Sequence, residues 1–240
     1  MHKRPHDSWA EVYDVAYEAS FGSMYQKLTE QTLNFVNENS SEFSQILDIG
    51  AGTGRTSIPL SEMGFQVTAV DASKEMLRVL ANKDIERKIS TTHSTLQKLD
   101  LDKTFDVVLC VFSVFCYITD YEELMKALEN LTRHVKPSGY AFIDVPSIYA
   151  FRGLEYKDQD LYRSVSVSEV SGQDALFTYD EHITIETNSG TKTYRDRFHI
   201  KHWDPELILD ALSSFGMALN YDASMEFAGS GAHYFKLTWQ

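Results

Sequence analysis

The chain has 240 residues, and 43% of them are hydrophobic, which is enough to bury a sizeable core as one domain with a lobe inserted in it. Its 35 acidic residues outnumber the 22 basic ones, so the formal net charge is −13. That sign disfavours nucleic acid as a partner, because surfaces that bind nucleic acid are basic. The longest nearly continuous apolar run, residues 107–118, is too short to cross a bilayer, and we expect neither a membrane segment nor a signal peptide.

Cysteine usage favours a reducing compartment. Cys110 and Cys116 lie in or next to a predicted core strand, and their spacing is typical neither of a metal site nor of a disulfide framework. We therefore expect reduced thiols, no metal and a cytoplasmic protein.

Two helices are predicted ahead of the first strand. Ser8 and Glu11 have the spacing of a capping box, so the first helix is expected to start near Trp9. Tyr13 and Tyr17 then share one of its faces. The second helix carries an apolar stripe formed by Tyr25, Leu28, Thr32, Phe35 and Val36.

The motif that organises the chain is I-L-D-I-G-A-G-T-G at residues 46–54. Its apolar start predicts a buried central strand, and Gly50, Gly52 and Gly54 allow a tight turn and close approach of the backbone to a ligand. Residues 55–63 have helical character and would point their amide groups at that ligand. A second strand over 65–70 then ends at an acid.

That acid, Asp71, stands about 20 residues after the first glycine, where a carboxylate can hold a ribose diol. Two departures from the dinucleotide pattern decide between ligands. Arg55 replaces the third glycine of that pattern, and Asp48 would repel a pyrophosphate but could accept a hydrogen bond from an ammonium group. S-adenosylmethionine has an ammonium group and no phosphate.

The pattern D-x-G-x-G-x-G with V-D-A-S-K-E-M-L at 70–77 resembles the class I S-adenosylmethionine-dependent methyltransferases, in their small-molecule, N-methyltransferase-like branch. The resemblance implies an α/β fold with a Rossmann-like, mostly parallel seven-stranded sheet, helices on both faces, and S-adenosyl-L-methionine as cofactor. The cofactor-binding residues expected from it are Tyr13, Asp48, Gly50, Ala51, Gly52, Gly54, Asp71, Ala72, Met76, Ser94, Thr95, Val111 and Phe112.

The segments after this motif fit the same domain. Ser73 can cap a helix that runs through Leu80, and a short strand near 89–92 ends at the turn 93–95. In the family this turn lies beside the adenine, often with a carboxylate. None occurs here, so Ser94 or backbone groups would substitute.

The clearest buried strand is predicted over 105–112. Residues 112–117 follow it and should face the donor methyl group, because ligands bind beyond the carboxyl ends of parallel strands. Asp120 and Glu123 then cap a helix, and 140–145 forms the fifth strand.

Residues 146–203 change to period two, with Val165/Val167, Ile183/Ile185 and a turn at 188–190, which predicts an inserted antiparallel lobe. A helix from Asp204 and strands over 217–222 and 232–239 complete the chain. We therefore expect a cofactor-binding domain from 1–145 and 204–240, in which the helices of 1–41 cap the site. The lobe at 146–203 is expected to be an acceptor wall or a homodimer contact.

Methyl transfer is an in-line displacement in which alignment can supply roughly 7 to 11 kcal/mol. A hydroxyl or protonated amine also needs a base. Tyr117 and His199 are the catalytic candidates, although a histidine can stand near the position of Tyr117 in the family. The residues expected at the acceptor are Trp9, Tyr17, Tyr117, Asp144, Arg195 and Arg197.

The function expected is methyl transfer to a small-molecule acceptor, with an amine preferred over a hydroxyl because aromatic rings around the site stabilise cations. One alternative is a cofactor-binding regulatory protein without turnover, favoured by the absence of that histidine. Another, an NAD-dependent oxidoreductase, is disfavoured by Arg55 and Asp48.

Overall fold

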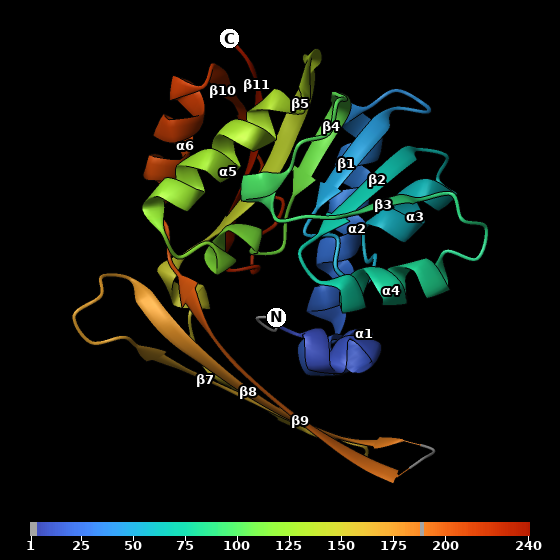
Figure 1. Cartoon of the computed structure of the whole chain (residues 1–240), viewed down its shortest axis with the longest axis vertical. Helices are drawn as coiled ribbons and strands as arrows, with labels where there is room; N and C mark the ends of the chain where they lie inside the picture. The colour runs from blue at the N-terminus through green and yellow to red at the C-terminus, as the bar shows by residue number, and fades with distance from the viewer. Residues whose placement is uncertain (1–3, 188–189) are drawn as a thin grey trace.

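The computed structural model describes residues 4–187 and 190–240 and contains two sheets (Figure 1). The larger has seven strands in the order β10-β11-β5-β4-β1-β2-β3. Neighbouring strands from β5 to β3 run parallel, and β11 pairs antiparallel with β5 and β10. This confirms the predicted fold class. The strands are β1 (Gln45–Ile49), β2 (Gln66–Asp71), β3 (Ser90–His93), β4 (Phe105–Cys110), β5 (Val135–Pro146), β10 (Met217–Asp222) and β11 (Ala232–Trp239).

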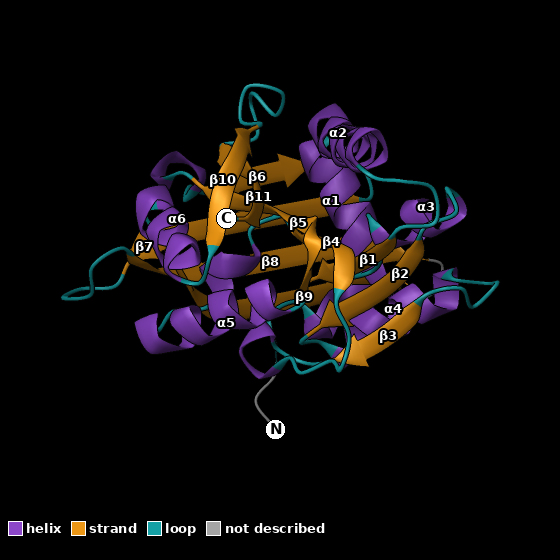
Figure 2. Ribbon diagram, turned by 90° about the horizontal axis from the view of Figure 1, so that it is seen from above, coloured by secondary structure: helices purple, strands orange, loops and turns teal. Residues whose placement is uncertain are grey.

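Helices cover both faces of this sheet (Figure 2). One face packs against α5 (Tyr121–Arg133) and α6 (Pro205–Ser214). The other packs against α2 (Ser23–Asn39), α3 (Ser57–Glu62) and Leu80 of α4 (Lys74–Lys83). Burial on both faces explains why the central strands are nearly continuous apolar runs in the sequence.

Three predicted helix caps are confirmed. The Ser73 hydroxyl accepts from the Met76 N–H of α4 at 3.0 Å, Asp120 accepts from the Glu123 N–H of α5 at 3.0 Å, and Asp204 accepts from the Glu206 N–H of α6 at 2.9 Å. Each bond satisfies an amide that the first helical turn would leave unpaired.

The predicted capping box at the N-terminus is wrong. Residues Asp7–Val12 form the 3-10 helix η1, with Trp9 outside helical geometry, and α1 begins only at Tyr13 (Tyr13–Phe21). The Ser8 hydroxyl is buried without a hydrogen-bond partner among the described residues. The Trp9 ring is buried against Tyr13 and Tyr17, so tertiary packing overrides the local capping signal here.

The antiparallel lobe forms a separate sheet in the order β6-β7-β8-β9. Its strands are β6 (Leu154–Lys157), β7 (Leu161–Glu169), β8 (Leu176–Thr187) and β9 (Gly190–Lys201). The sheet lies below the larger one, with α1 between them (Figure 1). Its inner face buries Leu161, Ile183 and Ile185 against Trp9 and Tyr17, so the lobe packs on the N-terminal segment of its own chain. Of the turn predicted at 188–190, residues 188 and 189 lie outside the described part.

Candidate active site

A cleft opens at the carboxyl ends of β1, β2 and β4, where parallel sheets bind ligands. Twelve of the thirteen residues predicted to bind cofactor line it, and Gly54 does not. Gly54 instead lets the helix pass close to Leu80, because an added Cβ would lie 2.9 Å from the Cγ of that side chain. Its role in this structure is packing.

The glycine turn after β1 needs glycine for two reasons. Gly50 and Gly52 have φ of 73° and 55°, a region that favours glycine. A Cβ on Gly50 would also overlap the Val114 side chain. Glycine at these positions therefore leaves the backbone of the turn accessible from the cleft.

Asp71, at the end of β2, ties this turn to its neighbours. Its Oδ2 accepts the Gly52 N–H at 2.8 Å, and its Oδ1 accepts the Ser73 N–H at 2.7 Å. Burial raises the pKa of Asp71 above the usual value, while the two N–H bonds oppose that change. The carboxylate thus fixes the backbone on both sides of the cleft and keeps lone pairs for a ligand.

Asp48 is buried at the floor of the cleft with 2% exposure. Its Oδ2 accepts from the hydroxyls of Thr56 at 2.7 Å and Ser57 at 2.6 Å. Both bonds go to the same oxygen, which leaves Oδ1 for a ligand. Burial raises the pKa of Asp48, and the two hydroxyls oppose that rise.

The loop after β4 is strained and supported from below. Phe112 and Ser113 have φ of 71° and 68°, which ends β4 two residues earlier than predicted. Asp144 on β5 accepts the Ser113 N–H at 2.9 Å and 3.1 Å through its two oxygens. Asp144, predicted to contact acceptor, is 2% exposed and does not line the cleft. Burial raises its pKa to about 7 against the opposing effect of these N–H bonds.

Several lining residues were not predicted. Arg55 lines the cleft, with its guanidinium 4.4 Å from the Phe112 ring centroid and Nη1 2.9 Å from the Thr29 hydroxyl. Arg4, Pro5 and His6 line it as well. From the sequence, Arg55 was noted only because it departs from the dinucleotide-binding motif. No sequence pattern predicted that the three N-terminal residues would line the cleft.

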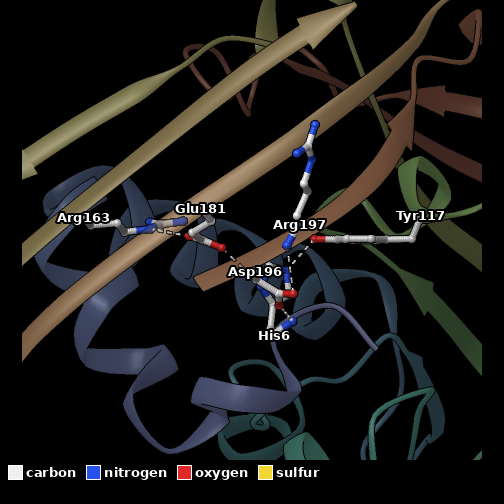
Figure 3. Close-up of polar contacts among 6 residues, drawn as sticks. All are labelled: His6, Tyr117, Arg163, Glu181, Asp196 and Arg197. Carbon is white, nitrogen blue, oxygen red and sulfur yellow. Dashed lines mark hydrogen bonds and ion pairs between the residues drawn. The ribbon is translucent and has the colours of Figure 1, made fainter. Parts of the chain in front are cut away.

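His6 enters the cleft from the N-terminus and meets Tyr117 (Figure 3). Its Nε2 is 3.0 Å from the Tyr117 hydroxyl, and its backbone N–H donates to Asp196 on β9 at 2.6 Å. Tyr117 was a predicted candidate, and its partners come from segments far away in the sequence.

The aromatic residues predicted at the cofactor and the acceptor separate into two groups. Tyr13 and Tyr117 line the cleft, whereas Trp9 and Tyr17 lie behind them with 1% and 6% exposure. The Tyr13 and Tyr17 rings stack with centroids 4.2 Å apart. Trp9 and Tyr17 therefore support the wall of the cleft.

The two arginines predicted on β9 do not reach the cleft. Arg195 and Arg197 are exposed, and the Arg197 guanidinium lies 3.7 Å from Asp180. Figure 3 shows Arg197 pointing away from His6. Side chains alternate along a strand, so both arginines lie on the face opposite to Asp196. His199 is also an odd-numbered residue of β9, like the two arginines, but it lines the cleft.

An ion pair is buried on the inner face of the lobe. The Arg163 Nε on β7 donates to Oε1 of Glu181 on β8 at 2.8 Å, and the side chains are 0% and 1% exposed. The Arg163 guanidinium also lies 4.1 Å from the Tyr17 ring centroid. Neither residue was predicted to belong to a site.

Other kinds of site find little support in the described part of the chain. Over residues 4–187 and 190–240, no group of three His, Cys, Asp or Glu could hold a metal ion. Cys110 and Cys116 are buried free thiols, and burial raises the pKa of both. Among the described helices, none has the length and apolarity to span a membrane.

The fold is shared with solved S-adenosylmethionine-dependent methyltransferases. The structure of S-adenosylmethionine-bound CalS10, an amino pentose methyltransferase from Micromonospora echinaspora, superposes with a TM-score of 0.76 over 100% of both chains, at 17% identity. More particularly, residues 46–139 match the family described as "Methyltransferase domain". This match covers 94 of the 240 residues.

Curated relatives are similar over part of the chain. The cypemycin N-terminal methyltransferase of Streptomyces sp is 39% identical over 99 residues, which are 41% of this chain and 40% of the relative. The ubiquinone biosynthesis O-methyltransferase of Rickettsia typhi is 39% identical over 102 residues, 41% of this chain and 39% of the relative. The similarity thus spans about two fifths of these relatives' length.

Proposed function

We propose that this chain transfers a methyl group from S-adenosylmethionine to a small-molecule acceptor by in-line displacement, with an amine as the preferred acceptor. The observation that carries the proposal is the convergence of Asp48, Asp71 and the bare glycine turn on one cleft. A free Asp48 oxygen suits the ammonium group of the cofactor, and Asp71 suits its ribose.

The cleft is lined by more residues than those expected to bind the cofactor. Its lining also includes His6, Tyr117 and His199. We place the acceptor there and assign the lobe of 146–203 to the wall behind it, in preference to a dimer contact.

Charge and aromatic rings favour an amine. Glu181 and Asp196 stand behind His6 on the inner face of the lobe, and Arg163 offsets only one of these two acids. Aromatic faces next to a net negative field stabilise cations. The relatives named above include both N- and O-methyltransferases, so the preference rests on the site itself.

We further propose a cytoplasmic enzyme that works on small molecules without a nucleic-acid partner. The net charge of −13 supports the second part. The two buried free thiols support the first.

Calorimetry tests the cofactor assignment. S-adenosylmethionine and S-adenosylhomocysteine are expected to bind with micromolar affinity, and NAD is not. At a hundredfold excess over its dissociation constant the ligand should stabilise the fold by about 2.7 kcal/mol. Absence of heat with both sulfur compounds would refute the proposal.

An acceptor panel tests the reaction. Methyl-labelled cofactor would be offered with amino sugars, free and nucleotide-linked, with a peptide carrying a free α-amino group, and with catechols. Labelled product from an amine supports the preference, and product from a catechol alone reverses it. Cofactor binding with no turnover across the panel would favour a regulatory protein.

A further inference from the structure

Tyr117 presents a chemical difficulty as a base. Its hydroxyl is at the acceptor end of the cleft, but a phenol keeps its proton near neutral pH because its ordinary pKa is about 10. A phenol that resists ionisation cannot take up a proton unless it passes its own proton on. The structure supplies a neighbour that could receive it.

That neighbour is His6. Its Nε2 is 3.0 Å from the Tyr117 hydroxyl, and the residue is 6% exposed. An imidazole nitrogen is a good proton acceptor near neutral pH. The contact joins residues that are 111 positions apart, so it exists only because the N-terminal segment folds back over the cleft.

Several features hold the ring in place. His6 has φ of 68°, an uncommon conformation for a residue with a side chain. The backbone N–H is anchored on Asp196 at 2.6 Å. Trp9 and Phe198 contact the ring edge-on, with centroids 4.9 Å and 5.3 Å away. These contacts fix the position of the His6 ring in the fold.

The far side of the ring faces a carboxylate. The His6 Nδ1 lies 3.5 Å from the Glu181 Oε2, and neither atom has a hydrogen-bond partner among the residues that the structure describes. The other oxygen of Glu181 is held by Arg163. A protonated ring would place its Nδ1–H beside this carboxylate, as when a base is oriented by a third group.

We propose that His6 is the proton acceptor of the transfer, reached from the acceptor through the Tyr117 hydroxyl. This inference rests on the proposed function and adds that the acceptor enters as an ammonium ion. The ammonium gives a proton to the Tyr117 oxygen while Tyr117 gives its own to the His6 Nε2. The amine lone pair then forms the N–C bond, and the C–S bond breaks with its electron pair left on sulfur. His6 later releases its proton to solvent.

The pH dependence of this step depends on the groups around the ring. Tyr117, Tyr13, Tyr17 and Glu181 face it, Asp196 bonds its backbone, and Asp71 interacts with it across the cleft. The pH profiles of kcat for wild type and His6→Gln should therefore differ in shape.

The first experiment measures kcat, KM and cofactor affinity for His6→Gln with an amino-sugar acceptor. We expect kcat to fall about 10²- to 10⁴-fold with the cofactor dissociation constant unchanged. His182→Gln is the matched control, since His182 lies next to Glu181 on β8 but faces the other side of the sheet. Its kcat should remain at the wild-type value.

The second experiment is rescue with imidazole. His6→Gly suits the positive φ and leaves a ring-sized space. Imidazole should bind this variant in calorimetry, but not wild type, and should restore part of kcat. Tyr117→Phe should lose activity that imidazole does not restore.

These outcomes separate the two proposals. Failure of wild type to bind S-adenosylmethionine would refute the proposed function. If cofactor binds and His6→Gln stays folded with kcat within threefold of wild type, His6 is not the proton acceptor. Imidazole binding to His6→Gly without recovery of kcat would overturn the inference as well, because the ring would then only fill space.

Discussion

The two ends of the cleft are built in different ways. At the end that we assign to the cofactor, the decisive bonds join residues close in sequence: Asp71 to the Gly52 N–H over 19 positions, and Asp48 to Ser57 over 9. At the end that we assign to the acceptor, His6 meets Tyr117 over 111 positions and Asp196 over 190. The first end follows from one strand–turn–helix unit, and the second requires the whole chain to be folded.

The difference shows which kind of information each end needs. Glycines and acids at fixed spacing determine backbone geometry directly, so the cofactor end follows from local rules. The acceptor end depends on which side chains two sheets and a terminal segment bring together. This end also contains the buried ion pair of the lobe. Removing one partner of the pair would leave the other charge buried and unpaired.

The largest effect should come from breaking that pair. Arg163→Met leaves Glu181 buried without its cation, and we expect a loss of about 3 to 5 kcal/mol in the free energy of unfolding. The double variant Arg163→Met/Glu181→Leu should recover most of it, because no isolated charge remains. Urea denaturation measures both. Arg78→Met, at an exposed pair with Glu75, is the control and should change little.

A double variant no more stable than Arg163→Met would contradict this account of the lobe. It would mean that the geometry of the pair, rather than the unpaired charge, governs packing against Tyr17. Cofactor affinity should stay the same in the folded variants, since Arg163 and Glu181 are outside the cleft lining.

A signal for this pair was present in the sequence. Arg163 has the same parity as Val165 on β7, and Glu181 has the same parity as Ile183 on β8. Two opposite charges at inward positions of an alternating pattern predict a buried ion pair. The same parity rule places Arg195 on the outer face, against our expectation.

Other features could not be predicted from local patterns. The capping box at Ser8 failed because burial of Trp9 outweighs one hydrogen bond. The positive φ of Phe112 and Ser113 depends on Asp144, which lies 31 positions after Ser113. By contrast, the caps at Ser73, Asp120 and Asp204 were predictable because each is a contact within one helical turn.

The second prediction concerns Asp144, under the loop that divides the two ends. Its pKa is raised to about 7 by burial, so the folded state binds a proton that the unfolded state releases between about pH 4 and 7. Stability from this group is therefore present below pH 4 and is lost as the pH rises to 7, by roughly 4 kcal/mol. Asp144→Asn should be free of this dependence.

Urea unfolding of both proteins from pH 4 to 8 checks the sign. Asp106 gives the opposite control. Burial alone would raise its pKa, but the Gln45 N–H and the Lys136 ammonium lower it below the usual value. Its contribution should stay constant from pH 4 to 8 and be lost only as the pH falls below about 4. A constant stability difference between wild type and Asp144→Asn would show that Asp144 does not titrate in this range.

The third prediction tests the cofactor end through Asp71→Asn. The amide cannot accept from the ribose and from both backbone N–H groups at once, and hydrogen bonds to a charged group contribute roughly 1.5 to 3 kcal/mol. The cofactor dissociation constant should rise about 10- to 150-fold in calorimetry. Asp84→Asn is the matched control, because Asp84 also accepts two backbone N–H groups, from Lys88 and Ile89, outside the cleft. Equal affinities in both variants would remove Asp71 from the site.

The smallest effect compares two helix caps of the same kind. Ser73→Ala and Asp120→Ala should each lower the free energy of unfolding by about 1 kcal/mol, since each loses one cap bond. Only Ser73 lines the cleft, and its hydroxyl also donates to Asp7 of η1, next to His6. Ser73→Ala should therefore loosen the N-terminal segment and speed proteolytic cleavage within residues 4–12, whereas Asp120→Ala should not. Equal cleavage rates would mean that Asp196 and the aromatic contacts of His6 hold the segment without Ser73, and the two ends of the cleft would then be independent.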